Sequence, residues 1–250
     1  MEQTNMEQAG TEQAGTDRAA ARTPRVAVLG AGGRAGRAVS AEFVRRGHRV
    51  LGVVRDPDRH AGLRAEGIDL VRADATGGPA LVDALAGADV IVVAVTPFTA
   101  PPPTFDGFDE TYYEQVVRAV AAAARTSPPA RLLTIGLFAT LTLADGGLVL
   151  DDAELFPPAL LPFARAHARV LPALRQHADA LDWLVLTPPA GLQLGDGAAT
   201  ARPELVTGPV ERARATGALS YAELARAVVD QALTPDLHRT QVTVLTGQPG

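Results

Sequence analysis

The sequence predicts an α/β fold in which a doubly wound parallel sheet carries helices on both faces. Three observations support this prediction. Apolar runs alternate with amphipathic segments from about residue 25 onward, which is typical of a parallel sheet. The first run, VAVLG (26–30), is hydrophobic throughout, as expected of a strand that is covered on both faces. A glycine-rich turn, GAGGRAG (30–36), follows this run and leads into a helical pattern.

Seven apolar runs are expected to form the strands of the sheet. They lie at residues 26–30, 49–54, 68–71, 89–95, 131–136, 183–186 and 241–247. Helical patterns separate them. Val39, Phe43 and Val44 share one face of the first helix, which Gly47 ends. Two short helices follow, one in the Asp- and Pro-containing segment after the second strand and one that ends at Gly87.

Three longer helices complete the pattern. A helix after the fourth strand is predicted by the spacing of Tyr113, Val116, Val117, Val120 and Ala124. Residues 159–178 form a further helix, which Pro162 and Pro172 are expected to kink or divide. The last helix covers 220–233, and its capping box consists of Ser220 and Glu223.

The two ends of the chain differ in character. Residues 1–23 are polar and repeat EQAGT at 7–11 and again at 12–16. Such a segment buries too little apolar surface to offset its ordering entropy, so it is predicted to be a disordered tail. Residues 24–250 are expected to form a single domain, because 250 residues at 47% hydrophobic content suffice for one sizeable core.

Composition excludes several classes of protein. A net charge of −5 gives no electrostatic support for a nucleic-acid partner. No apolar stretch approaches about 18 residues without a charge or a proline, so no membrane span is expected. No secretion signal is recognisable, and a cytoplasmic location is expected. With no cysteine and five scattered histidines, no metal site is expected. All 23 basic residues are arginine, which removes lysine chemistry altogether.

The glycine-rich turn has the context of a dinucleotide-binding loop. A strand, the pattern G-x-x-G-x-x-G (Gly30, Gly33, Gly36), a helix and a second strand follow one another within about 30 residues. The first glycine makes the turn, the second lets backbone approach a pyrophosphate, and the third lets the helix pack on the strand. Amides at the helix start then face the phosphates. The alternative is a tight turn that binds no ligand.

Arginines near this turn favour NADP(H) over NAD(H). An NAD enzyme carries an acid at the end of the second strand, where it binds the ribose 2′-hydroxyl. Here Arg55 holds that position and Arg34 lies inside the glycine turn. Two guanidinium groups suit a 2′-phosphate, which they can bind bidentately. The alternative is that Arg55 only solvates the strand end while Asp56 binds the ribose of NAD.

The chain resembles the atypical short-chain dehydrogenase/reductases, which have a Rossmann-type fold. The resemblance rests on VAVLGAGGRAGRAVSAEFVRRGHRVLGVVRDPDR (26–59), VRADAT (71–76), DALAGADVIVVAV (83–95), RLLTIG (131–136), LDWLVLTPP (181–189) and LSYAELARAVVDQAL (219–233). It extends over about residues 25–248. Within this group the chain is most similar to the NmrA-like and the flavin- and biliverdin-reductase-B-like NAD(P)H-binding proteins.

The resemblance implies a set of cofactor-binding residues. In the glycine turn the set contains Gly30, Gly32, Gly33, Arg34, Ala35 and Gly36, and Arg55 follows the second strand. Asp74 and Ala75 would border the adenine, Val95, Thr96 and Pro97 the middle of the cofactor, Gly136 the ribose, and Thr187, Pro188 and Pro189 the nicotinamide.

The sequence departs from these relatives where catalysis takes place. Many of them carry a Tyr-x-x-x-Lys about 25 residues beyond the fifth strand, and the tyrosine exchanges a proton with the substrate. Phe163 and His167 stand at this distance here. Because Phe163 has no proton to give, the usual Tyr-Lys mechanism is excluded. Thr140 is the remaining hydroxyl in GLFATL (136–141), where the NmrA-like branch often has a glycine-rich turn that contains serine.

Three residues are candidates for the chemistry. His167 could donate a proton or orient a carbonyl; the alternative is a surface histidine on an arginine-rich helix. Thr140 could polarise a carbonyl, or it is one of many hydroxyls near a strand end. Tyr113, next to Tyr112, begins a helix at the edge where ligands bind, so one phenol could reach the site while the other packs in the core.

Two proline-rich apolar segments are expected to form walls of a substrate site. They are TPFTAPPPTF (96–105) and LFPPALLPF (155–163), and the alternative is that they are plain spacers. The substrate-side elements are expected over about 137–180 and 188–220. This pattern indicates a hydrophobic, non-phosphorylated small molecule that is recognised mainly by shape.

The function predicted from these observations is that of an NADPH-dependent reductase of a hydrophobic carbonyl or conjugated small molecule. Heavy use of Ala, Arg and Pro without Lys is typical of a GC-rich bacterial genome, and secondary metabolism is the setting we expect. Two alternatives stand beside this prediction. One is a non-redox isomerase, cyclase or dehydratase on the same scaffold, and the other is an NmrA-like dinucleotide-binding sensor. The sequence leaves a homo-oligomer open.

Overall fold

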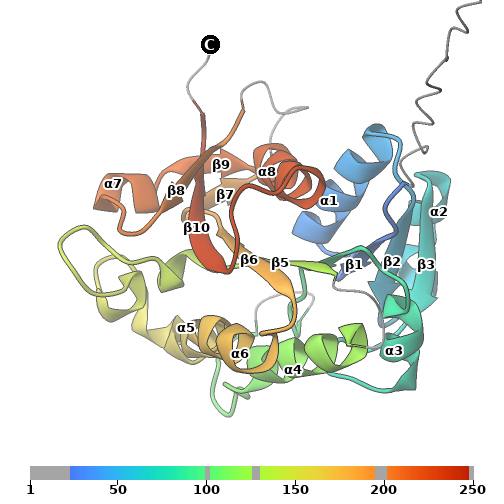
Figure 1. The fold of residues 1–250 in the computed structure, drawn as a ribbon. Helices are drawn as coiled ribbons and strands as arrows, with labels where there is room; N and C mark the ends of the chain where they lie inside the picture. Colours follow the sequence, from blue (N-terminus) through green and yellow to red (C-terminus); the bar gives the residue numbers. More distant parts are fainter. Residues whose placement is uncertain (1–22, 99–101, 126–129, 195–201, 248–250) are drawn as a thin grey trace, which may run out of the picture.

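The computed structural model of this protein describes residues 23–98, 102–125, 130–194 and 202–247. Within these ranges the chain forms an eight-stranded, mostly parallel sheet between two layers of helices (Figure 1). The strand order is β3-β2-β1-β4-β5-β6-β10-β8, and β8 runs antiparallel to β10. The predicted doubly wound, Rossmann-type α/β fold is therefore confirmed.

The strands of this sheet are short, and all of them except β8 follow the predicted apolar runs closely. They are β1 (Val26–Leu29), β2 (Val50–Val54), β3 (Ile68–Arg72), β4 (Val90–Val93), β5 (Arg131–Ile135), β6 (Asp182–Thr187), β8 (Glu204–Thr207) and β10 (Thr240–Leu245). The helices are α1 (Arg34–Arg45), α2 (Gly62–Ala65), α3 (Pro79–Leu85), α4 (Tyr112–Ala124), α5 (Leu161–Ala168), α6 (Val170–His177), α7 (Arg212–Ala215) and α8 (Tyr221–Leu233).

The core lies on both faces of the sheet, which explains why the strands read as continuous apolar runs. Val26 and Val28 of β1 pack in the cluster that contains residues of α1 and α8. Ala27 and Leu29 point to the opposite face, where residues of α3, α4 and α6 cover them. All four are at most 1% exposed. Figure 1 shows these two helical layers above and below the sheet.

A third, smaller cluster joins the two regions that the sequence assigns to the substrate side. It consists of Ala139, Leu141, Leu143, Val149, Phe156, Ala164, Val210 and Ala215. The Val210 amide donates to the Thr142 carbonyl and the Ala144 amide donates to the Val210 carbonyl, each at 2.9 Å. The segments around 137–164 and 203–220 are thus packed together, while their role on the substrate side stays a prediction.

The helix predicted over 159–178 is divided, as its two prolines indicated, but the break falls between them. Helix α5 ends at Ala168 and α6 begins at Val170. Pro162 and Pro172 lie in the first turns of α5 and α6. A proline in the first turn removes no intrahelical hydrogen bond, so each proline is compatible with the start of a helix.

Other differences from the sequence-based expectation are small. Strands β7 (Gly191–Gln193), β8 and β9 (Ala218–Ser220) were not predicted, because three or four residues show no period. The capping box of α8 is confirmed, since the Glu223 amide donates to Ser220 Oγ at 3.1 Å. The tail predicted over 1–23 lies almost wholly outside the described residues. No helix in the described ranges is both long and apolar enough to cross a membrane.

Candidate functional site

The candidate site lies at the carboxyl edge of the sheet, where the strand order reverses. Strand β1 lies between β2 and β4, and all three are parallel. The chain continues from β1 into α1 on one face and from β4 toward α4 on the other, which makes this the topological switch point. Ligands of open α/β sheets bind in the crevice at such a point.

The glycine turn is built by close backbone contacts that exclude side chains. Gly30 has a φ of +79°, and an added Cβ would overlap the carbonyl group of Ala94 at the end of β4. A Cβ on Gly36 would overlap the Gly30 carbonyl oxygen and stand 3.0 Å from Ala31 Cα. These two glycines therefore let α1 pack closely against the turn that follows β1.

The N-terminus of α1 offers amides to an anion. Its N-cap is Gly33, which supplies no side chain to the first-turn amides, and the first turn holds no acidic residue. The amides of Arg34, Ala35 and Gly36 have no acceptor inside the helix, and the Arg34 side chain is exposed beside them. This arrangement can hold a pyrophosphate by hydrogen bonds and by the positive end of the helix dipole.

Arg55, at the end of β2, reaches across to the segment after β4. Its guanidinium donates to the Pro97 carbonyl at 3.3 Å. The pKa of Asp74, after β3, is lowered by the hydroxyl and amide of Thr76, and to a lesser extent by Arg55. Burial raises the pKa of Tyr112, and the nearby Arg55 opposes that shift. The structure thus gathers Arg55 and Asp74, both predicted at the adenosine end, with Tyr112 and with Pro97, which was predicted at the middle of the cofactor.

Asp56, the residue offered as a ligand of an NAD ribose, is engaged elsewhere. Its carboxylate lies 3.5 Å from the Arg72 guanidinium of β3 and accepts a hydrogen bond from the Asp58 amide at 3.3 Å. Arg72 also donates to the Arg55 carbonyl at 2.9 Å. The acid beside the strand end is therefore paired with an arginine, whereas Arg34 and Arg55 remain exposed.

The residues predicted around the middle and the nicotinamide end of the cofactor differ in exposure. Thr96 is exposed, and Val95 and Pro97 are half-buried; Ala75, predicted at the adenine, is buried. A Cβ on Gly136 would overlap the Thr187 hydroxyl, so the ends of β5 and β6 touch here. Thr187, Pro188 and Pro189 are themselves buried. Their contact with a nicotinamide stays a prediction.

Thr140 belongs to a hydrogen-bonded group that sequence reasoning did not find. The Gln241 amide, on β10, donates to Thr140 Oγ1 and to Thr187 Oγ1, each at 3.0 Å. Thr140 Oγ1 in turn donates to the Leu137 carbonyl at 2.9 Å. The single hydroxyl proton of Thr140 is thus already engaged. Nothing in the sequence pattern distinguishes Gln241 from any other polar residue in a strand.

His167 is buried, so the alternative of a surface histidine on an arginine-rich helix is wrong. The side chain is 9% exposed, and burial lowers its pKa to about 3. The exposed arginines of that helix instead pair outward, Arg165 with Glu110 at 3.8 Å and Arg169 with Glu114 at 3.5 Å. At neutral pH the imidazole is uncharged, and its Nδ1 has no partner among the described residues.

The imidazole of His167 lies in an aromatic cluster that joins the segment after β4 to α5. Its ring centroid is 3.8 Å from that of Tyr113 and 4.8 Å from that of Phe163. Phe163 also contacts Phe98 and Phe105, at 5.3 and 5.6 Å. The two positions where relatives carry Tyr and Lys are therefore occupied by rings that pack on one another.

Tyr113 is the buried member of the tyrosine pair. It is 4% exposed, and burial raises the pKa of its phenol, which stays protonated at neutral pH. The nearby Thr96 side chain lowers that pKa to a lesser extent, and the hydroxyl has no other hydrogen-bond partner within the described part of the chain. Tyr112 is half-buried, with its ring edge-on to Tyr113 at 5.1 Å. One phenol of the pair thus packs in the core, as expected, and it is Tyr113, the candidate for the chemistry; a phenol that reaches the substrate stays a prediction.

Comparison with known proteins decides the family. A sequence family described as NAD(P)H-binding matches residues 30–235. The chain belongs to this NAD(P)H-binding family. It is 25% identical over 230 residues to YwnB of Bacillus subtilis strain 168. The matched region covers 89% of this chain and 98% of YwnB.

Solved structures share the fold of this NAD(P)H-binding protein. One from Burkholderia pseudomallei is 26% identical with a TM-score of 0.73, over 89% of this chain and 100% of that one. A protein from Streptococcus pneumoniae TIGR4, proposed to be an NADH-flavin reductase, is 23% identical with a TM-score of 0.71. The match covers 90% of this chain and 100% of that one. The anaerobilin reductase ChuY from Escherichia coli O157:H7 is 18% identical with a TM-score of 0.65. The match covers 90% of this chain and 100% of ChuY.

The residues of this chain fit the dinucleotide that the NAD(P)H-binding family implies. The glycine turn leaves a backbone surface without side chains beside uncapped amides of α1, as a pyrophosphate requires. Exposed Arg34 and Arg55 stand at the predicted adenosine end, and the aromatic cluster lies beyond the end of β4. A nicotinamide dinucleotide is thus chemically compatible with this edge of the sheet.

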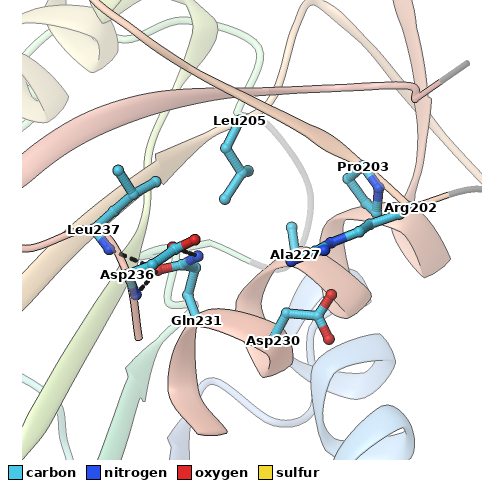
Figure 2. Close-up of a pocket in the computed structure, with 8 residues that line it drawn as sticks. All are labelled: Arg202, Pro203, Leu205, Ala227, Asp230, Gln231, Asp236 and Leu237. Atoms are coloured by element: carbon cyan, nitrogen blue, oxygen red, sulfur yellow. Dashed lines mark hydrogen bonds between the residues drawn. The ribbon is translucent and has the colours of Figure 1, made fainter. Parts of the chain in front are cut away.

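A separate groove lies between β8 and α8 (Figure 2). Its volume is about 300 Å³, and its walls include Arg202, Leu205, Asp230, Gln231 and Asp236. Figure 2 shows the side-chain amide of Gln231 between Asp236 and Leu237. Its Nε2 donates a hydrogen bond to Asp236 Oδ1 and its Oε1 accepts one from the Leu237 backbone amide, so these polar groups are hydrogen-bonded to one another. Asp230 is paired with Arg46, the residue directly after α1, at 2.7 Å. None of the predicted cofactor residues lines this groove.

Proposed function

We propose that this protein is an NADPH-dependent reductase of a hydrophobic carbonyl or conjugated small molecule. The observation that carries the proposal is the position of the uncapped α1 N-terminus and two exposed arginines at the same sheet edge as an aromatic wall. When bound, the dinucleotide would supply a hydride from its nicotinamide ring. The protein supplies binding and orientation.

Binding falls to residues at the switch point. The amides that begin α1 hold the pyrophosphate, and Arg34 and Arg55 hold the ribose 2′-phosphate. The engagement of Asp56 by Arg72 supports NADP(H) over NAD(H), because a carboxylate in that pair is less available to a ribose hydroxyl. Gly136 and Thr187 border the nicotinamide in this proposal.

The acceptor lies against the aromatic cluster. Phe98 and Phe163 are half-buried, so each presents part of its ring at the surface near the end of β4. Such rings favour a flat, apolar acceptor that stacks on them. The names of two fold relatives, a flavin reductase and an anaerobilin reductase, make flavins and bilins the first acceptors to test, followed by quinones and polyketide-like ketones.

Water supplies the proton in this mechanism. His167 is neutral and buried, the Thr140 hydroxyl already donates to Leu137, and the Tyr113 phenol holds its proton because burial raises its pKa. A side chain that serves as general acid needs a pKa near the working pH and must reach the substrate, and none of these three groups meets both conditions, which leaves solvent water as the source of the proton. Solvent water at the side of the crevice where Thr96 is exposed can reach the substrate without any rearrangement of the protein.

The test combines calorimetry with turnover. Purified protein should bind NADPH and oxidise it with at least one acceptor of the panel. Replacement Thr140→Val should leave turnover within about twofold, whereas a group that transfers the proton would lose at least tenfold on removal. Absence of NADPH binding would refute the proposal at its first step.

A second function, a dinucleotide-binding sensor without turnover, is favoured by one observation. Phe163 and His167 occupy the positions of the usual catalytic pair and are packed together in the aromatic cluster. A sensor would bind NADPH with the same residues but leave it unoxidised across the whole panel. The reductase would oxidise it, so the same two measurements separate these functions.

A further inference from the structure

His60 lies against the glycine turn, at a place where no sequence pattern would put it. It ends the short 3-10 turn Asp58–His60 in the connection that follows β2. A Cβ built on Gly32 would overlap the imidazole of His60 at Cε1 and Nε2 and stand 2.7 Å from Cδ2. The ring therefore occupies the space that a side chain of residue 32 would fill.

The backbone at Gly32 does not by itself require glycine. Gly30, in the same turn, has a positive φ, whereas Gly32 does not. The three atoms nearest to the added Cβ all belong to the His60 ring. Glycine at position 32 is thus explained by the imidazole that lies on it.

The surroundings of His60 suit an anion. The ring lies on the glycine turn, which carries exposed Arg34, and His60 belongs to the connection that begins after β2 with exposed Arg55. The two acids of the same connection pair with an arginine of β3. The Arg72 guanidinium lies 3.5 Å from the Asp56 carboxylate and 3.9 Å from the Asp58 carboxylate. Within the described part of the chain neither ring nitrogen of His60 has a hydrogen-bond partner.

We propose that His60 is a specificity residue that binds the ribose 2′-phosphate of NADP(H) from above Gly32, together with Arg34 and Arg55. The 2′ position of a dinucleotide lies between the glycine turn and the end of the second strand, and the imidazole lies on that turn at Gly32. A ring nitrogen of His60 donates a hydrogen bond to the phosphate, and the absence of a side chain at Gly32 leaves the space that the ring occupies. This inference rests on the proposed preference for NADP(H).

Calorimetric titration with adenosine 2′,5′-bisphosphate and with 5′-AMP tests the role of His60 without any turnover. His60→Ala should weaken binding of the bisphosphate about tenfold, as expected for one charge-assisted hydrogen bond, and change 5′-AMP binding less than twofold. Gly32→Ala should weaken bisphosphate binding similarly, because its methyl group displaces the ring. The double variant should lose no more than either single one.

His177→Ala is the matched control, because this histidine lies on α6 and accepts a hydrogen bond from Arg118 of α4. It should bind both nucleotides as the wild type does. If the wild type prefers the bisphosphate and His60→Ala prefers it equally, the role of His60 is overturned while the cofactor proposal stands. If the wild type binds both nucleotides equally, the preference for NADP(H) is wrong, and the role of His60 falls with it.

Discussion

Gly36 and Gly33 separate two tasks of the glycine turn, helix packing and approach of the phosphate. A Cβ on Gly36 would overlap the Gly30 carbonyl oxygen and stand 2.7 Å from its carbon. Because every atom it meets is backbone, we take the upper end of the cost of overpacking, about 3 kcal/mol. The better helix propensity of alanine returns about 1 kcal/mol. Gly36→Ala should therefore lower the free energy of unfolding by about 2 kcal/mol.

Gly33→Ala is the matched control for this substitution. The nearest atom to its added Cβ is the Gly30 carbonyl oxygen at 3.4 Å, and its φ of −79° suits any residue. Loss of a glycine N-cap costs at most about 1 kcal/mol. The new methyl group would instead stand on the surface that we assign to the pyrophosphate, so this variant should lose most of its NADPH affinity.

Urea unfolding followed by circular dichroism measures the stability of both variants, and calorimetric titration with NADPH measures binding. Gly36→Ala should be the less stable protein and Gly33→Ala the weaker binder. A Gly36→Ala protein with wild-type stability would refute the packing argument. A Gly33→Ala protein with wild-type NADPH affinity would show that the middle glycine does not face the cofactor.

Two further predictions concern stability. The unfolded chain takes up a proton on His167 below about pH 6.5, whereas the folded protein holds this pKa at about 3, so wild-type stability should fall with pH. By pH 5 the loss relative to His167→Leu should be on the order of 2 kcal/mol, and parallel pH profiles in urea unfolding would contradict it. Arg131, 7% exposed, pairs with Asp182 at 2.6 Å and donates to the Leu237 carbonyl at 2.6 Å. Arg131→Met should cost about 3 kcal/mol in the same assay, and a loss below about 1 kcal/mol would show that water replaces the arginine.

The backbone half of the site could be predicted from the sequence because its constraints are local. Gly30 and Gly36 are fixed by a positive φ and by a helix that packs on a turn, and both needs appear as a spacing within a few residues. The same holds for the apolar runs of the strands, which are covered on both faces. Short strands such as β7 and β9 have no comparable signal.

The side-chain half of the site could not be predicted, because its partners are distant in sequence. Gln241 and Thr140 are 101 residues apart, and their contact depends on β10 joining the sheet beside β6. The place of His60 on Gly32 likewise depends on how the connection after β2 folds back. The burial of His167 could not be predicted for another reason. The arginines beside it indicated an exposed helix, yet the face of α5 that carries His167 points inward.

The burial of His167 also predicts what would follow if the usual catalytic pair were restored. The environment that holds the pKa of this imidazole at about 3 disfavours a positive charge by on the order of 5 kcal/mol. A lysine ammonium at the same place would meet the same apolar rings, among them Tyr113 and Phe163. The double variant Phe163→Tyr with His167→Lys should therefore melt well below the wild type and gain no reductase activity. Phe163→Tyr alone, at a half-buried ring, should stay close to wild-type stability. A stable double variant with increased NADPH oxidation would instead mean that position 167 tolerates a charge and reaches the substrate together with position 163.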